Sequence, residues 1–304
     1  MTKLDHIDKQ ILLMLVGNCR TPYREIAKSL GMSATAIKSR VDDLVVNGIV
    51  TEFTIEFSPA MIGSEYMMAW LKTDTTEDRA QFISKIATNR GVRQVVPLYG
   101  GDYLIIAEYA SSLELATLAE ALKSNPHVSF TEIHTLLVQR GKKTNLTNLQ
   151  LRVLKALLTD ARMLITDIAR DTGLTVRLVR KTLRELEESE AIRFSLRWRL
   201  NVSDRVTFIL KLKWDPKRAS RNEIMDLLQK NYKDELWDIL ASASDPILIG
   251  IAIVDNLNHV DMITTEIRSH PAMLYSEAIM YRPPLNCKSL RRLTLEEAVQ
   301  AAGV

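Results

Sequence analysis

The sequence predicts an α+β protein in which two winged helix-turn-helix domains alternate with two ferredoxin-like domains of βαββαβ order. Three observations predict this arrangement. One half of the chain repeats in the other half, each copy opens with three helices broken by a glycine turn, and each then alternates strands with helices. We therefore expect domains at 1–60, 61–140, 141–203 and 204–283, followed by a C-terminal basic tail and short helix at 284–304.

The repeat is clearest in its first part, where residues 4–50 align on residues 146–192 without a gap. Leucine and alanine matches carry little weight, because any two amphipathic helices share them. The informative matches are Arg20 on Arg162, Gly31 on Gly173 and Ser33 on Thr175. The downstream parts match more weakly, as NPHVSFTE (125–132) and HPAMLYSE (270–277), and a polar joint separates the two copies at 139–148.

The first domain begins with apolar residues at helical spacing, which predict a helix that opens near Asp5. A second helix is expected over 23–30, and Gly31 then stands where a helix end needs a left-handed residue. Ser33 is a good N-cap for a third helix, ATAIKSRVDDLVV. This is helix-turn-helix spacing, in which the last helix lies in the major groove. The alternating residues from Ile49 onward predict the first arm of a wing hairpin.

The third helix of each domain has one buried stripe and one face for DNA. In the first domain the expected groove-side residues, including the cap and the flanks, are Ser33, Thr35, Lys38, Ser39 and Arg40. In the second domain they are Thr175, Arg177, Arg180, Lys181 and Arg184. The following strand adds Arg193, Arg197 and Arg199, which are spaced to straddle a phosphate backbone.

The two helix-turn-helix domains differ in charge. Residues 33–57 hold two basic and four acidic side chains, a sum of −2, whereas residues 175–199 hold seven basic and four acidic ones, a sum of +3. Because neutralised phosphates supply most of the non-specific affinity for DNA, the second domain is expected to bind DNA more strongly.

Each ferredoxin-like domain is predicted from four strands and two helices. The first has strands at 66–74, 92–99, 102–109 and 128–138 with helices at 77–90 and 112–124. The second has strands at 206–214, 235–242, 246–254 and 273–281 with helices at 220–232 and 256–269. Such a sheet leaves one face without helices. We expect the two open faces to cover each other as an intrachain pseudo-dimer.

The loop LYGGDY (98–103) joins the middle strands of the first sheet. Its glycines would let backbone amides approach an anion, and its aspartate would accept an amine, which is the chemistry of an amino acid effector. The candidate effector-binding residues are Gly100, Gly101, Asp102 and Tyr103. A tight hairpin with an Asp cap explains the same residues equally well. The second domain has ASASDP (241–246) here, so an equivalent second pocket is not expected.

Composition excludes several classes of protein. No apolar run approaches the roughly 20 residues of a membrane span, and no leader opens the chain, so we expect a cytoplasmic protein without a membrane partner. Cys19 and Cys287 form no CxxC pair, and the five histidines lack ligand spacing. We expect no metal site, no cofactor and no catalytic residues.

The chain resembles the Lrp/AsnC (feast/famine) transcription regulators through LDHIDKQILLMLVGNCR, IAKSLGMS and RVDDLVVNGIV. The hairpin Gly100-Gly101-Asp102-Tyr103 resembles that of the family's RAM domain. The resemblance covers 4–140 well and 146–282 more loosely, as in a fused, two-copy member. It implies double-stranded DNA as partner, an amino acid or similar small effector between RAM-like domains, and a homo-oligomer. The groove-side residues of the first domain and Gly101 and Asp102 match the family's functional positions.

Two departures from the family pattern affect these expectations. Ser189-Glu190 replace Asn47-Gly48 in the second copy. The tail after Arg282 carries Lys288, Arg291 and Arg292 beside a short helix, a basic patch that either contacts DNA or clasps another subunit.

Two other functional classes fit the same architecture. Sirohaem decarboxylases resemble it and also occur as fused pairs, with basic and histidine residues in a tetrapyrrole pocket between the RAM-like modules. This chain is poor in histidine, and its cations gather on the third helix of the second copy, where such an enzyme has no use for them. The other class is a protein–protein adaptor with degenerate helix-turn-helix units. The residues favour a DNA-binding regulator that is not an enzyme.

Overall fold

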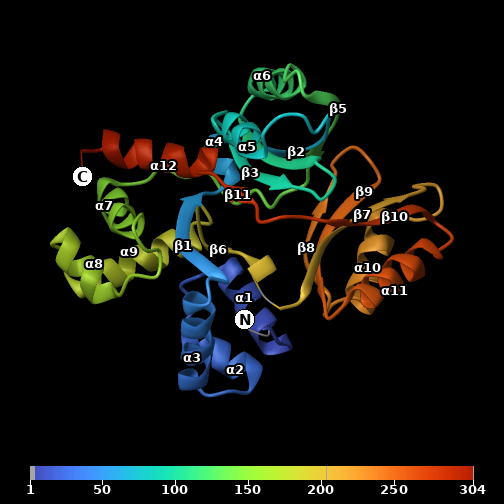
Figure 1. The fold of residues 1–304 in the computed structure, drawn as a ribbon. Coiled ribbons are helices and arrows are strands. Elements are labelled where there is room, and N and C mark those ends of the chain that lie inside the picture. Colours follow the sequence, from blue (N-terminus) through green and yellow to red (C-terminus); the bar gives the residue numbers. More distant parts are fainter. Residues whose placement is uncertain (1–3, 203, 304) are drawn as a thin grey trace. The chain divides into compact units, whose positions relative to one another are not determined.

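The computed structural model describes residues 4–202 and 204–303, which form two compact units (Figure 1). Unit 1 contains the described residues of 1–64, 139–202 and 288–304, and unit 2 contains those of 65–138 and 203–287. Each unit therefore draws on both copies of the repeat. The α+β fold class predicted from the sequence is confirmed.

Unit 1 holds two matching sets of three helices. The first set is α1 (His6–Gly17), α2 (Tyr23–Leu30) and α3 (Ala34–Val46), and the second is α7 (Asn148–Leu157), α8 (Ile165–Thr172) and α9 (Val176–Glu188). Local chemistry sets their ends. Ser33 and Thr175 cap α3 and α9, and Gly31 and Gly173 end α2 and α8 with φ of 65° in both cases. A side chain at that φ would be strained, so glycine suits both turns.

The predicted wing hairpin is wrong. After α3 comes a single strand, β1 (Val50–Phe57), and after α9 comes β6 (Ile192–Trp198), and these two strands pair antiparallel with each other (Figure 1). The short helices α4 (Pro59–Ile62) and η1 (Leu200–Val202) follow them. Each wing is thus completed by the other copy, and Ile55, Phe57, Ile192 and Phe194 bury their side chains in a core shared with α7, α8 and α9.

The basic residues predicted in the C-terminal tail do not form one exposed patch. Helix α12 (Leu290–Ala301) packs on α7 and β1, and Arg291 and Arg292 are buried. Arg291 pairs with Glu56 at 2.5 Å, and Arg292 donates to the carbonyl of Ile55 at 2.8 Å. Neither arginine is available to DNA or to another subunit, because backbone carbonyls and a buried carboxylate already hold them. The exposed Lys288 pairs with Glu296 at 2.8 Å.

Unit 2 contains the two ferredoxin-like modules. The first consists of β2 (Glu65–Thr73), α5 (Arg79–Ala87), β3 (Val92–Pro97), β4 (Tyr103–Tyr109), α6 (Ser112–Lys123) and β5 (Val128–Leu136). Its sheet has the order β11-β3-β4-β2-β5, where β11 (Leu285–Asn286) is an edge strand that the sequence did not predict. Helices α5 and α6 cover one face of the sheet through Phe82, Ile86, Leu118 and Leu122.

The second module repeats this plan with β7 (Val206–Trp214), α10 (Arg221–Asn231), β8 (Leu236–Ala241), β9 (Ile247–Val254), α11 (Leu257–Arg268) and β10 (Met273–Met280). Its strand order is β10-β7-β9-β8, which is the order of the first sheet without β11. Helices α10 and α11 cover one face, with Ile224, Leu228, Ile263 and Ile267 buried beneath them. Within the described ranges, no helix has the length and apolarity of a membrane span.

The faces of the two sheets that lack helices share one apolar cluster, to which the first sheet contributes Met68, Trp70 and Ile106 and the second Ile209 and Ile249. The sheet edges also meet by backbone hydrogen bonds. The amide of Leu137 donates to Ala241 at 2.9 Å, and that of Tyr99 donates to Met280 at 3.0 Å. The two contacts join the end of β5 to β8 and the end of β3 to β10, so each module gives and receives the same kind of contact.

Candidate nucleic-acid interface

The strongest candidate for a nucleic-acid interface is the outer face of α9. Val179, Leu183 and Leu186 are buried, and they anchor the helix on α7 and α8. The opposite side exposes four cations, Arg177, Arg180, Lys181 and Arg184. Their spacing of three, four and seven residues places them on one side of the helix. Of these, Lys181 lies 3.6 Å from Glu185, an exposed pair of little strength.

The three arginines of this face make no ion pair or hydrogen bond within residues 4–202 and 204–303. Their guanidinium groups are therefore available to an external acceptor. Guanidinium groups bind phosphate oxygens and the O6 and N7 atoms of guanine in a bidentate manner. Thr175 lies at the start of the helix and is exposed, but its hydroxyl already accepts the amide of Leu178 at 3.3 Å as the N-cap.

The matching face of α3 is different. Thr35, Lys38 and Ser39 are exposed, as predicted from the helical spacing. Lys38, however, pairs with Asp42 at 2.6 Å. The cap residue Ser33 accepts the amide of Ala36 at 3.1 Å. The face of α3 thus offers hydroxyl groups and an internally paired cation.

Arg40, a predicted groove-side residue, is already paired within unit 1. Its guanidinium group pairs with Asp5 at 2.8 Å and with Asp8 at 2.7 Å, so it ties α3 to the start of α1. Asp5 and Asp8 also form the capping box of α1. Sequence reasoning missed this contact, although a doubly acidic helix start is a signal for a cation nearby.

The three wing arginines have unequal surroundings. Arg193 donates to the side chain of Gln139 at 3.0 Å, and Arg197, only 19% exposed, pairs with Glu52 at 3.2 Å. Arg199 is exposed. Arg197 thus pairs across the β1–β6 strand pair, Arg193 contacts the joint between the two copies, and Arg199 is the exposed member of the three.

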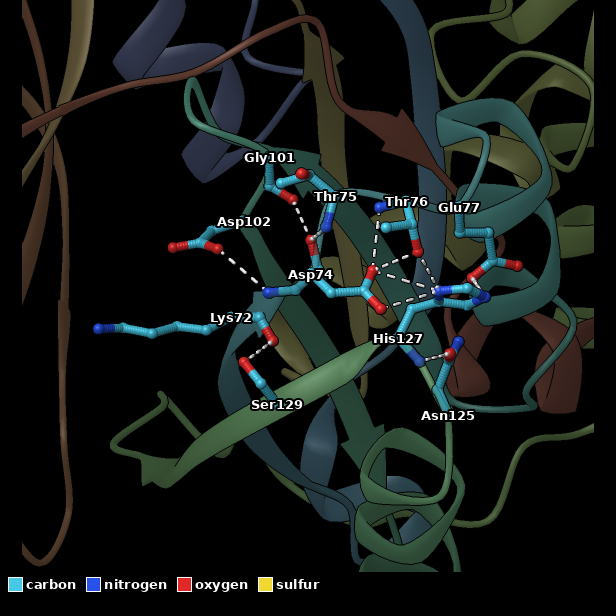
Figure 2. A network of polar contacts seen from close by, with 11 residues as sticks. Lys72, Asp74, Thr75, Thr76, Glu77, Gly101, Asp102, Asn125, His127 and Ser129 are labelled. Carbon is cyan, nitrogen blue, oxygen red and sulfur yellow. Dashed lines mark hydrogen bonds and ion pairs between the residues drawn. The ribbon is translucent and has the colours of Figure 1, made fainter.

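The first module of unit 2 contains a small hollow of about 70 Å³, and two of the four predicted effector residues line it. Gly101 and Tyr103 line the hollow, whereas Gly100 and Asp102 do not. The Asp102 carboxylate accepts the amide of Thr73, which lies outside the hairpin, at 3.2 Å (Figure 2). A side chain at Gly101 would collide with Thr75, since its Cβ would lie 2.4 Å from the methyl group.

Other residues of the hollow, which the sequence did not single out, supply its charge. They are Asp74, Glu77, Arg79 and His127. His127 lies 3.2 Å from Asp74 and 3.9 Å from Glu77 (Figure 2). The amide and hydroxyl of Thr76 hold the pKa of Asp74 below its ordinary value. One carboxylate oxygen of Glu77 is buried without a hydrogen-bond partner. Asp74 and Glu77 lie between β2 and α5, Arg79 begins α5, and His127 lies in the turn before β5, so only the folded module brings them together.

Family models match both helix-turn-helix segments. Residues 4–45 match the AsnC-type helix-turn-helix domain, and residues 146–193 match a winged helix-turn-helix DNA-binding domain. Among curated proteins, the chain is 35% identical over 104 residues to the HTH-type transcriptional regulator LrpA of Pyrococcus horikoshii, which covers 34% of this chain and 73% of LrpA. It is 30% identical over 145 residues to the HTH-type transcriptional regulator FL11 of the same organism, covering 46% of this chain and 92% of FL11.

One solved structure is similar over almost the whole chain. It is the siroheme decarboxylase NirDL, which matches with a TM-score of 0.57 and 13% identity over 98% of this chain and 100% of that protein. At this identity the likeness concerns the fold alone, namely the duplicated arrangement of helix-turn-helix and sheet domains.

Proposed function

Because the chain belongs to the Lrp/AsnC family of transcriptional regulators, we propose that it binds double-stranded DNA with α9 in the major groove and regulates transcription. The observation that carries this proposal is the exposed cationic face of α9, whose three arginines have no partner among the described residues. Such a face suits phosphate oxygens and guanine edges together. The start of α9 adds the positive end of a helix dipole.

A salt titration of DNA binding tests the proposal. We expect Arg177→Ala combined with Lys181→Ala to weaken binding about 10- to 100-fold at low salt and to reduce the slope of log K against log salt by about 1.8, because each lost phosphate contact removes about 0.9. Lys85→Ala combined with Lys230→Ala is the matched control, since both lysines are exposed and lie on helices of unit 2. Failure of the intact chain to bind any duplex at about 50 mM salt would refute the proposal.

We also propose that the hollow beside Gly101 binds a small zwitterion such as an amino acid. The buried oxygen of Glu77, which accepts no hydrogen bond and has His127 at 3.9 Å, would accept an ammonium group, and Arg79, at the opening of α5, would bind a carboxylate. Thermal shift with each of the common amino acids would reveal the ligand. Glu77→Gln should abolish the shift, whereas Glu120→Gln on the exposed side of α6 should leave it unchanged. A shift that survives Glu77→Gln would argue against this site.

The shared architecture with siroheme decarboxylase NirDL makes an enzyme the second candidate. The interior of unit 2 supports the regulator instead. Apolar side chains fill the space between the helix-free faces of the sheets, and His134, which is 6% exposed, is engaged by Asp245 at 2.8 Å and Glu132 at 2.9 Å. We expect no Soret absorption band from bound sirohaem on titration. A stoichiometric band would favour the enzyme.

The reciprocal contacts within each unit support a further part of the proposal, that one fused chain replaces a homodimer. The β1–β6 pair joins the two helix-turn-helix sets of unit 1, and the paired sheet edges join the two modules of unit 2. A monomeric mass by light scattering for chains that bind DNA would agree with this.

A further inference from the structure

The helices α3 and α9 occupy matching places in the repeat but carry different charges. Both have 13 residues and a hydroxyl N-cap, so their backbones are comparable. Five exposed positions change charge between them: α9 gains positive charge at Thr35/Arg177, Ser39/Lys181 and Asp42/Arg184, and it gains carboxylates near its end at Val45/Glu187 and Val46/Glu188. The three cationic substitutions fall on the side opposite the buried stripe, so they alter what the helix presents and leave its packing alone.

Over the matching stretches 34–43 and 176–185, the exposed charge of the two helices differs by four. On α3 the exposed charges are Lys38, Asp42 and Asp43, a sum of −1, because Arg40 is paired with Asp5 and Asp8. On α9 they are Arg177, Arg180, Lys181, Arg184 and Glu185, a sum of +3, which the exposed Glu187 and Glu188 lower to +1 over the whole helix.

Release of Lys38 from Asp42 would not make α3 equivalent to α9. The pair is exposed, with 62% and 53% of the two side chains accessible, so it breaks at little cost. When Lys38 leaves, the Asp42 carboxylate remains on the same face and repels phosphate. The arginine that replaces Asp42 on α9 has the opposite effect at the matching point of the helix.

We infer that each chain reads a single DNA half-site through α9, while α3 contributes no phosphate neutralisation, so that a palindromic site is occupied by two chains. This inference rests on the proposed function. It predicts a different kind of operator, because a chain with two equivalent DNA-binding helices would favour one palindrome per chain. The chain instead keeps two helix-turn-helix sets and uses the charge of one of them.

Half-site replacement tests the inference on the intact chain. A duplex that binds one chain, and so holds one half-site rather than a palindrome, is selected from random DNA. Each half of this duplex is scrambled in turn, and the dissociation constant is measured by fluorescence anisotropy. We expect one scrambled half to weaken binding by at least about 100-fold and the other by less than about 3-fold. Equal losses from both halves would overturn the inference and leave the proposed function standing, whereas no binding to any duplex at about 50 mM salt would refute the proposed function itself.

A gain-of-function variant supplies the second test. Thr35→Arg, Ser39→Lys and Asp42→Arg together give α3 the cations of α9 at exposed positions. On a palindrome built from two copies of the α9 half-site, we expect binding at least about 10-fold tighter and a salt slope steeper by about 2.7, as for three added phosphate contacts. The control, Ser84→Arg, Asp226→Arg and Gln229→Lys, adds the same charge to exposed positions of unit 2. If the control variant tightens binding as much, or if neither variant tightens it, the lack of cations on α3 is not the reason why each chain reads one half-site.

Discussion

Two arginines at matching places of the repeat join the helix-turn-helix sets of unit 1. Arg20 donates to the carbonyls of Ala161 at 2.7 Å and Met163 at 3.1 Å. Arg162 returns the contact by donating to the carbonyl of Cys19. Burial lowers the pKa of Arg20, yet the group remains charged because an arginine pKa stays far above neutrality. An alignment of the repeat therefore identified two residues whose side chains cross between its copies.

Loss of Arg20 should destabilise unit 1. In Arg20→Ala the two carbonyls that it bonds lose a charged donor, so we expect the free energy of unfolding to fall by about 2–3 kcal/mol. Urea unfolding followed by circular dichroism measures the change. Arg170→Ala is the control, because Arg170 on α8 is 73% exposed and pairs only at the surface, with an expected loss below about 0.5 kcal/mol. An effect of Arg20→Ala no larger than that of the control would contradict this account.

The stability of unit 2 depends on pH through Glu132. Burial alone would raise the pKa of this carboxyl group, but hydrogen bonds from Lys211 and His134 outweigh burial and hold the pKa below its ordinary value of 4.5. A carboxyl group whose pKa is lowered by folding stabilises the fold above its unfolded pKa, and this stabilisation is lost as the pH falls through the lower folded value. We thus expect the Glu132 contribution to be complete above about pH 4.5 and to be lost below it, as the pH falls through the lowered folded pKa.

The variant Glu132→Gln should remove this acid-dependent contribution. At neutral pH we expect it to cost about 2 kcal/mol, because Lys211, whose side chain is 10% exposed, loses its ionic partner. As the pH falls below about 4.5, the variant and the parent should converge in stability, because the parent carboxyl group becomes protonated when the pH passes its lowered folded pKa. Urea unfolding monitored by tryptophan fluorescence between about pH 3 and 7 compares them, with Glu120→Gln as the control at an exposed position. A constant difference across this range would exclude Glu132 as the titrating group.

At the scale of single elements, the sequence predicted the features that depend on residues close together in the chain. The bounds expected for α2 and α3 agree with the structure, since Gly31 and Ser33 mark the turn between them by conformation and capping. The cationic face of α9 followed from helical spacing alone. The partner of β1 did not, because strand pairing joins residues far apart in the chain and alternation only identifies a strand.

Charged residues show the limit of the same reasoning. From sequence alone, basic residues on a helix are predicted to be exposed unless the partners of their charged groups are known. The partners of Arg291 and Arg40 lie in other elements. Glu77 of the candidate effector hollow was missed for the same reason, because it lies on the loop before α5 and meets Gly101 only in the folded sheet.

Helix α12 is held to unit 1 by the buried pair of Arg291 and Glu56. We expect Arg291→Met to cost about 3–5 kcal/mol, because it leaves the Glu56 carboxylate buried without its ionic partner. The double variant Arg291→Met with Glu56→Leu should recover much of the loss, since an apolar pair of similar volume avoids the unpaired charge. Unfolding in urea measures both, and Lys288→Ala, at an exposed pair on the same segment, is the control. A double variant weaker than the single one would contradict the assigned role of the pair.

At the scale of the whole molecule, neither copy of the repeat forms a compact unit by itself. Each unit takes a helix-turn-helix set or a sheet module from both copies. The first copy contributes one strand of the β1–β6 pair and one of the two sheets that share an apolar cluster in unit 2. An isolated half would expose both of these surfaces, and an exposed apolar face or strand edge favours association.

The charges of β1 and β6 favour association of the two different halves over association of two identical halves. The pairing places Glu52 opposite Arg197 and Glu56 opposite Arg193. Phe53 and Phe194 occupy matching positions, because their carbonyls accept equivalent amides from Ala161 and Cys19. On that correspondence two copies of β1 would place Glu52 opposite Glu56, and opposed like charges destabilise a strand pair.

A divided chain should therefore reassemble from unlike halves. We expect residues 1–145 and 146–304, cut in the irregular joint, to form a one-to-one complex when they are refolded together. The first half alone should form no homodimer of comparable resistance to urea, because its β1 strands repel each other. Light scattering gives the masses and urea unfolding gives the stabilities. Glu52→Arg in the first half should shift the balance toward its homodimer, because it replaces both repelling Glu52–Glu56 pairs with attractive ones. A wild-type first half that already dimerises as firmly as the mixture would show that strand charge does not choose the partner.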